Sequence, residues 1–409
     1  MKKNNTNNNI YILFMNDEKN QLCDYVQQTA RILSKKHFVI IAYYLESYSL
    51  FFILKNLGKF FSMLLKWKRI LLSEKAGVYD LEFISILPFQ RLENIYKLNM
   101  KLIWSELQFV LFLKKTLSLN WEKIVCWIFH PSAGPIVRKN SRTICLYDFL
   151  DYFESWPSDK EDLKDQTNRL IKKADFVFAN SNNLALTKRD IRKDIVEVPC
   201  GCAVDIFPLD FFMKKKPLLL NNINSPIMGY IGHIDYRIDF NLIEHILKTN
   251  KDINLVFIGK VLNTFFGNQT NYNKDVLPNM KKLQKYLNFH LVSEVTKQEL
   301  KNYLYYFDIA IIPYNIRHKF VYYSNPMKFY EYLAMDVPVV SVPIPSLLKY
   351  EMPVVRFGKT HEEFDKHIKY LIKHPELATK YKTQMRKIAE DNSWEKKVEE
   401  IQKHISLNS

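Results

Sequence analysis

Short apolar runs alternate with longer amphipathic stretches along most of the chain. In the first half, these runs predict β-strands at 10–15, 38–44, 81–87, 123–129, 143–148, 175–180 and 196–199. Segments of helical length and pattern lie between most of them. Continuous apolar strands that alternate with helices are typical of a parallel sheet covered on both faces, so this half predicts an α/β domain.

The pattern stops at residues 207–226 and then restarts. The interruption, FPLDFFMKKKPLLLNNINSP, contains prolines, lysines and an Asn cluster without a strand or helix period. Further strands are predicted at 226–232, 253–259, 287–293, 308–314, 337–343 and 352–358. We therefore expect two α/β domains in tandem, with a first domain at 1–207, a linker at 208–225, a second domain at 226–390, and an amphipathic helix in 391–409 that could pack back on the first domain.

The charge of the chain calls for a negatively charged partner. Its 409 residues have a formal net charge of +16, which suits nucleic acid, an anionic membrane surface or phosphorylated substrates. The aromatic residues fall mostly within predicted strands and helices, and no RNA-binding signature accompanies them. We therefore expect no nucleic-acid partner.

The cysteines and the N-terminus point to a reducing compartment. The 5 cysteines are odd in number and scattered, and Cys200-x-Cys202 has no second pair at zinc-ligand spacing. The first apolar run, at 10–15, is too short for the core of a signal peptide. We expect reduced thiols, no metal site and a cytoplasmic protein.

The stretch SNPMKFYEYLA predicts a helix that begins at Pro326, with Ser324 and Asn325 as caps. Lys328 lies in the first turn, where it opposes the helix dipole by roughly 0.3–1 kcal/mol, and a bound anion would reverse this cost. Glu331, one turn further and half-buried, needs partners such as the two hydroxyls of a ribose. The alternative is a solvent-exposed Lys–Glu pair.

This stretch resembles the nucleotide-binding segment of glycosyltransferases with the GT-B architecture, in which two Rossmann-like domains face each other across a cleft. The shared features are the proline, lysine and glutamate before YLA and the PVV strand that follows. The resemblance implies that Glu331 binds the donor ribose and Lys328 the diphosphate, with Ser324, Asn325 and Pro326 beside them.

The resemblance extends to MGYIGHIDYRIDFNLI, which is similar to the first strand and loop of the family's donor domain. It implies that the backbone of Gly232 approaches the diphosphate and that His233 and Arg237 lie near phosphate-binding positions. INLVFIGK is similar to the second strand, with Gly259 at its tip. The lysine that usually follows the first loop is absent, and only Arg237 lies near its place.

In the first half, ICLYDFLDYFESW, ADFVFANSNNL and VEVPCGCAVDIF resemble segments of bacterial surface-polysaccharide transferases, including teichuronic-acid-type enzymes. The resemblance spans roughly residues 120–400 and implies that the first domain takes the acceptor and the second the nucleotide sugar. Retaining enzymes of family four carry a glutamate eight residues before the ribose-binding one, and Tyr323 occupies that position. Inversion and retention therefore both stay open.

An inverting enzyme needs a general base within reach of the acceptor hydroxyl. His130, Asp148 and Asp151 end or follow predicted strands, so they would meet at one carboxyl edge of the first sheet. The structural alternatives are strand capping for the histidine and helix capping for the aspartates. No DxD triplet is present, so we expect no metal cofactor, and Lys328, Arg237 and helix dipoles would balance the diphosphate.

Residues 50–75 combine lysines and arginines with Phe, Leu, Met and Trp. A helix of this composition is typical of an interfacial membrane anchor, although it would equally serve as a cover helix of the first sheet. Its apolar run is too short to cross a bilayer. We therefore expect a protein bound peripherally, through residues 50–75, to the anionic inner face of the plasma membrane.

Taken as a whole, the sequence predicts a hexosyltransferase-type glycosyltransferase. By resemblance it would move a sugar from a nucleotide-diphosphate donor, with UDP as the expected nucleotide, to a lipid-linked or surface-polysaccharide acceptor. One alternative is a sugar-nucleotide epimerase of the same fold, which would have no use for the basic amphipathic stretch. Another is a non-catalytic scaffold that binds a membrane or nucleic acid and no nucleotide sugar.

Overall fold

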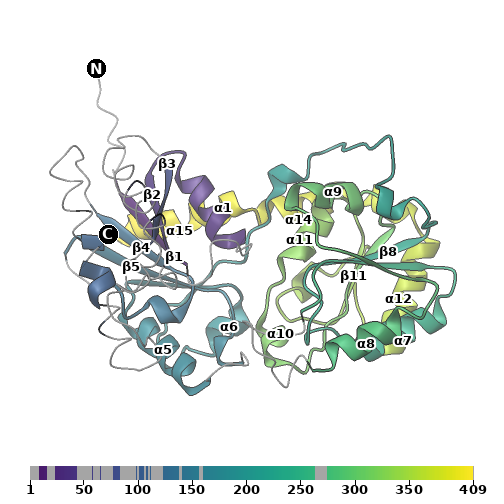
Figure 1. Ribbon diagram of the computed structural model, residues 1–409, viewed down its shortest axis with the longest axis horizontal. Coiled ribbons are helices and arrows are strands. Elements are labelled where there is room, and N and C mark those ends of the chain that lie inside the picture. The colour runs from purple at the N-terminus through teal and green to yellow at the C-terminus, as the bar shows by residue number, and fades with distance from the viewer. Residues whose placement is uncertain are drawn as a thin grey trace.

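The computed structural model describes residues 9–15, 24–43, 77–82, 123–137, 141–155, 160–262 and 274–408, with shorter pieces at 58, 65, 98, 101–105, 107–108 and 111 (Figure 1). Within these residues the chain forms two parallel sheets that lie side by side along the long axis of the molecule. Their strand orders are β3-β2-β1-β4-β5-β6-β7 and β10-β9-β8-β11-β12-β13.

The first sheet is built from β1 (Ile10–Met15), β2 (Phe38–Tyr43), β3 (Gly77–Glu82), β4 (Ile124–Ile128), β5 (Thr143–Phe149), β6 (Phe176–Ala179) and β7 (Val196–Glu197). Alternate residues of β1 belong to two different cores, Ile12 to one and Leu13 to the other. Helix α5 (Lys160–Lys173) contributes to the first core and α1 (Asp24–Leu33) to the second. The sheet is therefore covered on both faces, as the unbroken apolar runs predicted.

The strand predicted at 81–87 differs in position from the strand observed, β3. β3 begins at Gly77, where it pairs in register with Phe38, and residues 83–87 lie outside the described part of the chain. β3 is the edge strand of the sheet, and the exposed Val78 and half-buried Asp80 break the apolar run on which the prediction rested. A short helix, α6 (Asn182–Leu186), follows β6.

The second sheet consists of β8 (Ile227–Ile231), β9 (Asn254–Ile258), β10 (Phe289–Val292), β11 (Ile309–Ile312), β12 (Val339–Ser341) and β13 (Val355–Phe357). The helices of this half are α7 (Phe240–Thr249), α8 (Val276–Leu283), α9 (Lys297–Leu304), α10 (Lys319–Tyr323), α11 (Met327–Ala334), α12 (His361–Lys373), α13 (Glu376–Lys380) and α14 (Lys382–Asp391). Each predicted strand of this half is present.

Both sheets reverse their strand order once. The reversal falls between β1 and β4 in the first sheet and between β8 and β11 in the second. Such switch points, at the carboxyl ends of the strands, are where open α/β sheets bind their ligands. The predicted class, two Rossmann-like domains, is confirmed.

Helix α15 (Trp394–Asn408) returns from the second half to the first sheet, where the yellow helix of Figure 1 lies beside α1. Trp394, Val398, Ile401 and Ile405 complete the core on one face of that sheet. The start of α15 packs against Gly201 of the first domain. An added Cβ at Gly201 would lie 2.4 Å from the Trp394 ring, so only glycine fits there. In the part of the chain described here, no helix is long and apolar enough to cross a membrane, and the cysteines form no disulfide.

Candidate active site

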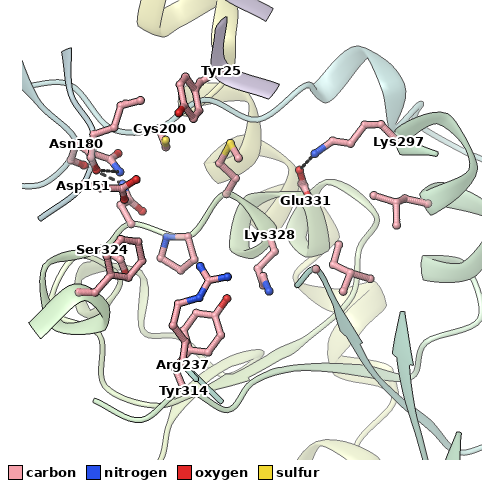
Figure 2. Close-up of a pocket in the computed structure, with 18 residues that line it drawn as sticks. Tyr25, Asp151, Asn180, Cys200, Arg237, Lys297, Tyr314, Ser324, Lys328 and Glu331 are labelled. Atoms are coloured by element: carbon pink, nitrogen blue, oxygen red, sulfur yellow. Dashed lines mark hydrogen bonds and ion pairs between the residues drawn. The ribbon is translucent and has the colours of Figure 1, made fainter. Parts of the chain in front are cut away.

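A cavity of about 310 Å³ lies between the two domains. The first domain lines it with Tyr25, Leu150, Asp151, Asn180 and Cys200. The second domain contributes Ile231, Gly232, Arg237, Lys297, Leu300, Tyr314, Phe320, Ser324, Asn325, Pro326, Met327, Lys328 and Glu331. Several of these residues follow strands at their carboxyl ends, and the others lie on α1, α9 and α11 or in the segment before α11. Figure 2 shows the charged ones converging on one space.

Helix α11 begins at this cavity. Its N-cap is Pro326, and no side chain caps its first turn. The predicted caps are wrong, because Ser324 Oγ donates to the carbonyl of Val321 and Asn325 Nδ2 donates to the carbonyl of Asn180 in the other domain. The bond from Asn325 ties the preceding loop to the first domain, and the positive end of α11 is left at the cavity wall.

Lys328 occupies the first turn of α11, and its side chain lines the cavity (Figure 2). Its Nζ lies 3.8 Å from the ring centroid of Tyr230 and 5.1 Å from that of Tyr314. Burial lowers the pKa of Lys328. The ring faces stabilise the cation there. An anion entering the cavity would therefore meet a desolvated positive charge.

Two glycines allow the loop after β8 to approach Lys328. Gly232 has a φ of +113°, and an added Cβ would lie 2.7 Å from Lys328 Nζ. Gly259, at the end of β9, has a φ of +152°, and its Cβ would lie 2.2 Å from the carbonyl oxygen of Gly232. Gly232 lines the cavity, whereas Gly259 lies behind it and permits the close approach of the two loops.

Arg237 lines the cavity and is held by Asp235. Its Nε and Nη2 donate to the Asp235 carboxylate at 2.8 and 2.6 Å. Burial alone would raise the pKa of Asp235, but the adjacent guanidinium lowers it below its usual value. Arg237 therefore stays charged and fixed. His233 lies next to this pair, outside the cavity lining, and burial lowers its pKa, so it contributes little positive charge there.

Glu331 is buried rather than half-buried, and its partner is Lys297 at the start of α9, with which it forms an ion pair (Figure 2). The alternative of a solvated pair between Lys328 and Glu331 is wrong. Both side chains border the cavity, but each is held by different neighbours. A buried carboxylate at a cavity wall needs strong hydrogen-bond donors, which Lys297 or a bound polyol can supply.

Of the three acids and bases predicted in the first domain, Asp151 alone lines the cavity. It follows β5 on the first-domain side of the space, across from Arg237 (Figure 2). Burial raises the pKa of Asp151 to about 6, partly opposed by the charge of Arg237. A carboxyl group with a raised pKa at the wall of a cleft suits proton transfer.

Asp148 lies three residues earlier but does not reach the cavity. Its fully buried carboxylate accepts a hydrogen bond of 3.0 Å from Lys397 of α15 and one of 3.4 Å from the Trp127 indole. Within β5 its side chain points to the face covered by α15, because neighbouring strand residues alternate between faces. The predicted role of Asp148 as a base at the cleft is therefore wrong, since its carboxylate is enclosed by protein.

His130 is also placed away from the cavity. It caps the short 3₁₀ turn at Pro131–Ala133, and its Nδ1 lies 2.6 Å from Ser132 Oγ. Burial lowers its pKa to about 3. The structure thus gives His130 a structural role, as the alternative predicted, but it caps the 3₁₀ turn rather than the strand, and it lies outside the cavity where the acceptor is expected.

Several cavity residues were missed by the sequence analysis. Asn180 follows β6 at the same sheet edge as Asp151, so the rule that found the aspartate could have found it. Lys297 carried no signal, because its relation to Glu331 exists only once α9 packs beside α11. Tyr25 and Tyr314 looked like ordinary aromatic positions of helix and strand ends.

Comparison with known proteins identifies the class. The sucrose-phosphate synthase of Thermosynechococcus elongatus superposes with a TM-score of 0.68 at 12% identity, over 98% of each chain. An Anabaena protein, Alr3699/HepE, solved in complex with UDP and glucose, gives 0.64 at 11% identity, over 97% of this chain and 99% of that one. The chain therefore has the GT-B architecture, as predicted.

The family and a curated relative give the activity. Residues 240–403 match the family described as Glycosyl transferase-like. Over 312 residues the chain is 23% identical to a Bacillus subtilis (strain 168) protein that is provisionally named a teichuronic acid biosynthesis glycosyltransferase, TuaH, with 71% of this chain and 74% of that one covered. The protein is a glycosyltransferase, and the prediction of an enzyme of this kind is confirmed.

Proposed function

We propose that the protein transfers a sugar from a UDP-sugar to a lipid-linked or surface-polysaccharide acceptor at the cytoplasmic face of a membrane. The single observation that carries the proposal is the start of α11, where Lys328 and Glu331 border the same cavity as Arg237. The UDP found in the Anabaena structure and the teichuronic acid name of the Bacillus relative support the donor and the acceptor class.

The donor is proposed to lie along α11. The diphosphate would meet the helix N-terminus, Lys328 and Arg237, which together offer a desolvated, fixed positive charge. The ribose hydroxyls would donate to Glu331 and take over part of the role that Lys297 now fills. This exchange keeps the buried carboxylate satisfied at every stage.

The donor site can be tested without knowing the acceptor, because a ligand that binds only the folded protein raises its melting temperature. We would measure this temperature with UDP, GDP, ADP and CMP for the wild type and for Glu331→Gln. The expected result is stabilisation by UDP and an affinity about tenfold or more weaker in the variant, since a charged hydrogen bond is worth about 1.5–3 kcal/mol.

The matched control is Glu244→Gln. Glu244 also pairs with lysines, Lys282 at 2.6 Å and Lys248 at 2.9 Å, but it lies on α7 outside the cavity lining. It should bind UDP like the wild type. If both variants lose UDP equally, or if no nucleotide stabilises the wild type, the donor site is not at α11.

Asp151 is proposed as the general base for the acceptor hydroxyl. It lies on the first-domain side of the cavity, and its raised pKa suits proton transfer near neutral pH. A base that acts directly on the acceptor belongs to an inverting reaction. The anomeric configuration of the product, measured by NMR, checks this, and a retained configuration would remove the base role.

No metal is proposed to take part. Within the described residues, no group of three or more His, Cys, Asp or Glu side chains is arranged to hold an ion. Lys328 and Arg237 would instead balance the charge of the departing diphosphate. Turnover should be unchanged by EDTA, and a loss that manganese restores would contradict the proposal.

The membrane part of the proposal concerns the acceptor. The predicted anchor at 50–75 lies almost entirely outside the described residues. Membrane association is proposed from two other observations, which are the teichuronic acid name of the relative and the net charge of +16. Release of UDP that depends on a lipid-linked acceptor would distinguish the transferase from an epimerase of the same fold, which needs no acceptor.

A further inference from the structure

Exposed apolar side chains gather in the segment that joins the two domains. Leu209 is 55% exposed, Phe212 70%, Leu218 84% and Leu219 53%. Single exposed apolar residues are common on proteins, but a cluster of this kind marks a surface that meets something else. We call these four residues, together with Lys214 and Lys215, the linker surface.

The linker surface is held in place from both ends. Phe207 and Leu220, which flank it, are fully buried in the core of the second domain. Between them, the Phe211 ring lies 5.9 Å from that of Tyr305, and Lys301 Nζ lies 5.5 Å from the Phe211 centroid. The backbone is thus anchored on α9 and the turn after it. The side chains of the linker surface are exposed, although the Phe212 ring also lies 6.3 Å from that of Tyr305.

The charges around these apolar groups are mainly positive. Lys214 and Lys215 are exposed, and Lys216 packs over the Tyr306 ring at 5.6 Å. The one acid between residues 207 and 220 is Asp210, which pairs with Lys382 at 3.2 Å. Apolar side chains that can enter an acyl layer, next to lysines that can meet lipid phosphates, suit an anionic bilayer.

Helix α9 connects the linker surface to the cavity. Lys297 and Leu300 of this helix line the cavity, and Lys301, one residue on, contacts Phe211 of the linker. Figure 1 shows the segment looping out beyond α9 at one side of the second domain. A membrane bound there would therefore lie near the wall of the cleft.

We propose that the linker surface docks the enzyme on an anionic lipid bilayer. The purpose of this docking, which is to bring the cavity to a lipid-linked acceptor, rests on the proposed function. Its physical basis, the exposed apolar and basic side chains, does not. A second copy of the chain suits the surface less well, because two lysine-rich faces would repel each other. RNA suits it less well too, because three of its four exposed apolar residues are leucines, on which bases do not stack, and Phe212 alone offers an aromatic ring.

The test is cosedimentation of the full chain with vesicles of phosphatidylcholine alone or mixed with phosphatidylglycerol. The wild type should bind the mixed vesicles and release them at high salt. Lys214→Glu with Lys215→Glu should weaken binding at least about 25-fold, since each lysine near an anionic leaflet contributes roughly fivefold. Phe212→Gln with Leu218→Gln and Leu219→Gln should weaken it by about tenfold or more.

Two control variants test whether any exposed leucine or any exposed pair of lysines would have the same effect on vesicle binding. Leu287→Gln changes an isolated leucine that is 97% exposed, and Lys281→Glu with Lys285→Glu reverses two exposed lysines elsewhere in the second domain. Both should bind vesicles almost like the wild type. All variants change exposed side chains, so their melting temperatures should stay close to that of the wild type.

The outcomes are distinguishable. Linker variants that bind vesicles as the wild type does would overturn the inference. So would a wild type that binds vesicles equally with and without phosphatidylglycerol. A dimeric wild type that becomes monomeric in the linker variants, with vesicle binding unchanged, would assign the surface to a second copy. UDP stabilisation, measured on the same variants, should be unaffected, so failure of the donor site and failure of the docking surface are separate results.

Discussion

Asp148 and Asp151 lie three residues apart at the end of the same strand, yet their surroundings are opposite. Asp148 points to the face covered by α15, where Lys397 and Trp127 donate to its carboxylate. Asp151 follows the strand and borders the cavity, with Arg237 of the other domain as its charged neighbour. In the sequence the two aspartates were equivalent candidates for the same role.

The difference lies in what each carboxylate can reach. Burial raises the pKa of both groups, so a perturbed pKa alone does not separate them. Asp148 is enclosed with a lysine that satisfies it, which is the arrangement of a structural ion pair. Asp151 is perturbed at the wall of a space that a substrate can enter, which is the arrangement of a functional group. Access to the cavity decides between the two roles.

The largest effect is expected for Asp151→Asn. Loss of a general base lowers the rate by about 10²–10⁴-fold. Because burial already disfavours the charged form of Asp151, its replacement should leave the melting temperature nearly unchanged. The measurement is kcat/KM from UDP release, together with thermal unfolding. A variant that keeps its rate would make Asp151 no different in function from Asp148.

The pH dependence of the wild type gives a second check on Asp151. The deprotonated carboxylate is the form that accepts a proton, and its pKa is about 6. The rate should therefore rise with pH through about 6 and level off above it. Asp151→Asn should lack this rise, so the residual rate of the variant should be nearly flat between pH 5 and 7.

A large loss of stability, but not of chemistry, is expected for Lys397→Met. Removing one partner of a buried pair typically costs about 3–5 kcal/mol of unfolding free energy, because the other charge is left enclosed. UDP stabilisation of the molecules that remain folded should persist. Lys396→Met is the matched control on the same helix, since Lys396 makes only a surface pair with Glu399 at 3.7 Å, which contributes about 0–1 kcal/mol.

A smaller effect is expected on how the unfolding free energy of Lys397→Met depends on pH. Lys397 now lowers the pKa of Asp148 against the effect of burial, so its removal raises the folded-state pKa further above the unfolded one. A carboxyl group shifted in this direction favours the folded state when protonated. Its contribution is lost as pH rises from the unfolded pKa of about 4 towards the folded one. Lys397→Met should therefore be less destabilised at pH 5 than at pH 8, relative to the wild type.

The smallest change is expected when both partners are replaced. Asp148→Leu combined with Lys397→Met removes the pair without leaving a buried charge, and such replacements are often close to neutral. The double variant should recover most of the stability that the single variant loses. Failure to recover would mean that Lys397 acts through its bond to the Val198 carbonyl as much as through Asp148.

The sheets were predictable from sequence because parallel strands buried on both faces appear as continuous apolar runs. β3 was misplaced because it is an edge strand with polar residues in it. The start of α11 was predictable because its proline, lysine and glutamate lie within six residues of one another. Lys297 and Lys397 were not predictable, since each meets its carboxylate only after distant segments pack together.

Helix α15 also has a consequence for the order in which the protein is made. Domains usually fold as they emerge from the ribosome, beginning with the N-terminal one. Here Trp394, Val398 and Ile401 belong to the core that contains β1, and Lys397 neutralises Asp148 in the same layer. Helix α1 covers part of that face, but the layer stays incomplete until the ribosome has translated the entire second domain and α15 has packed beside α1.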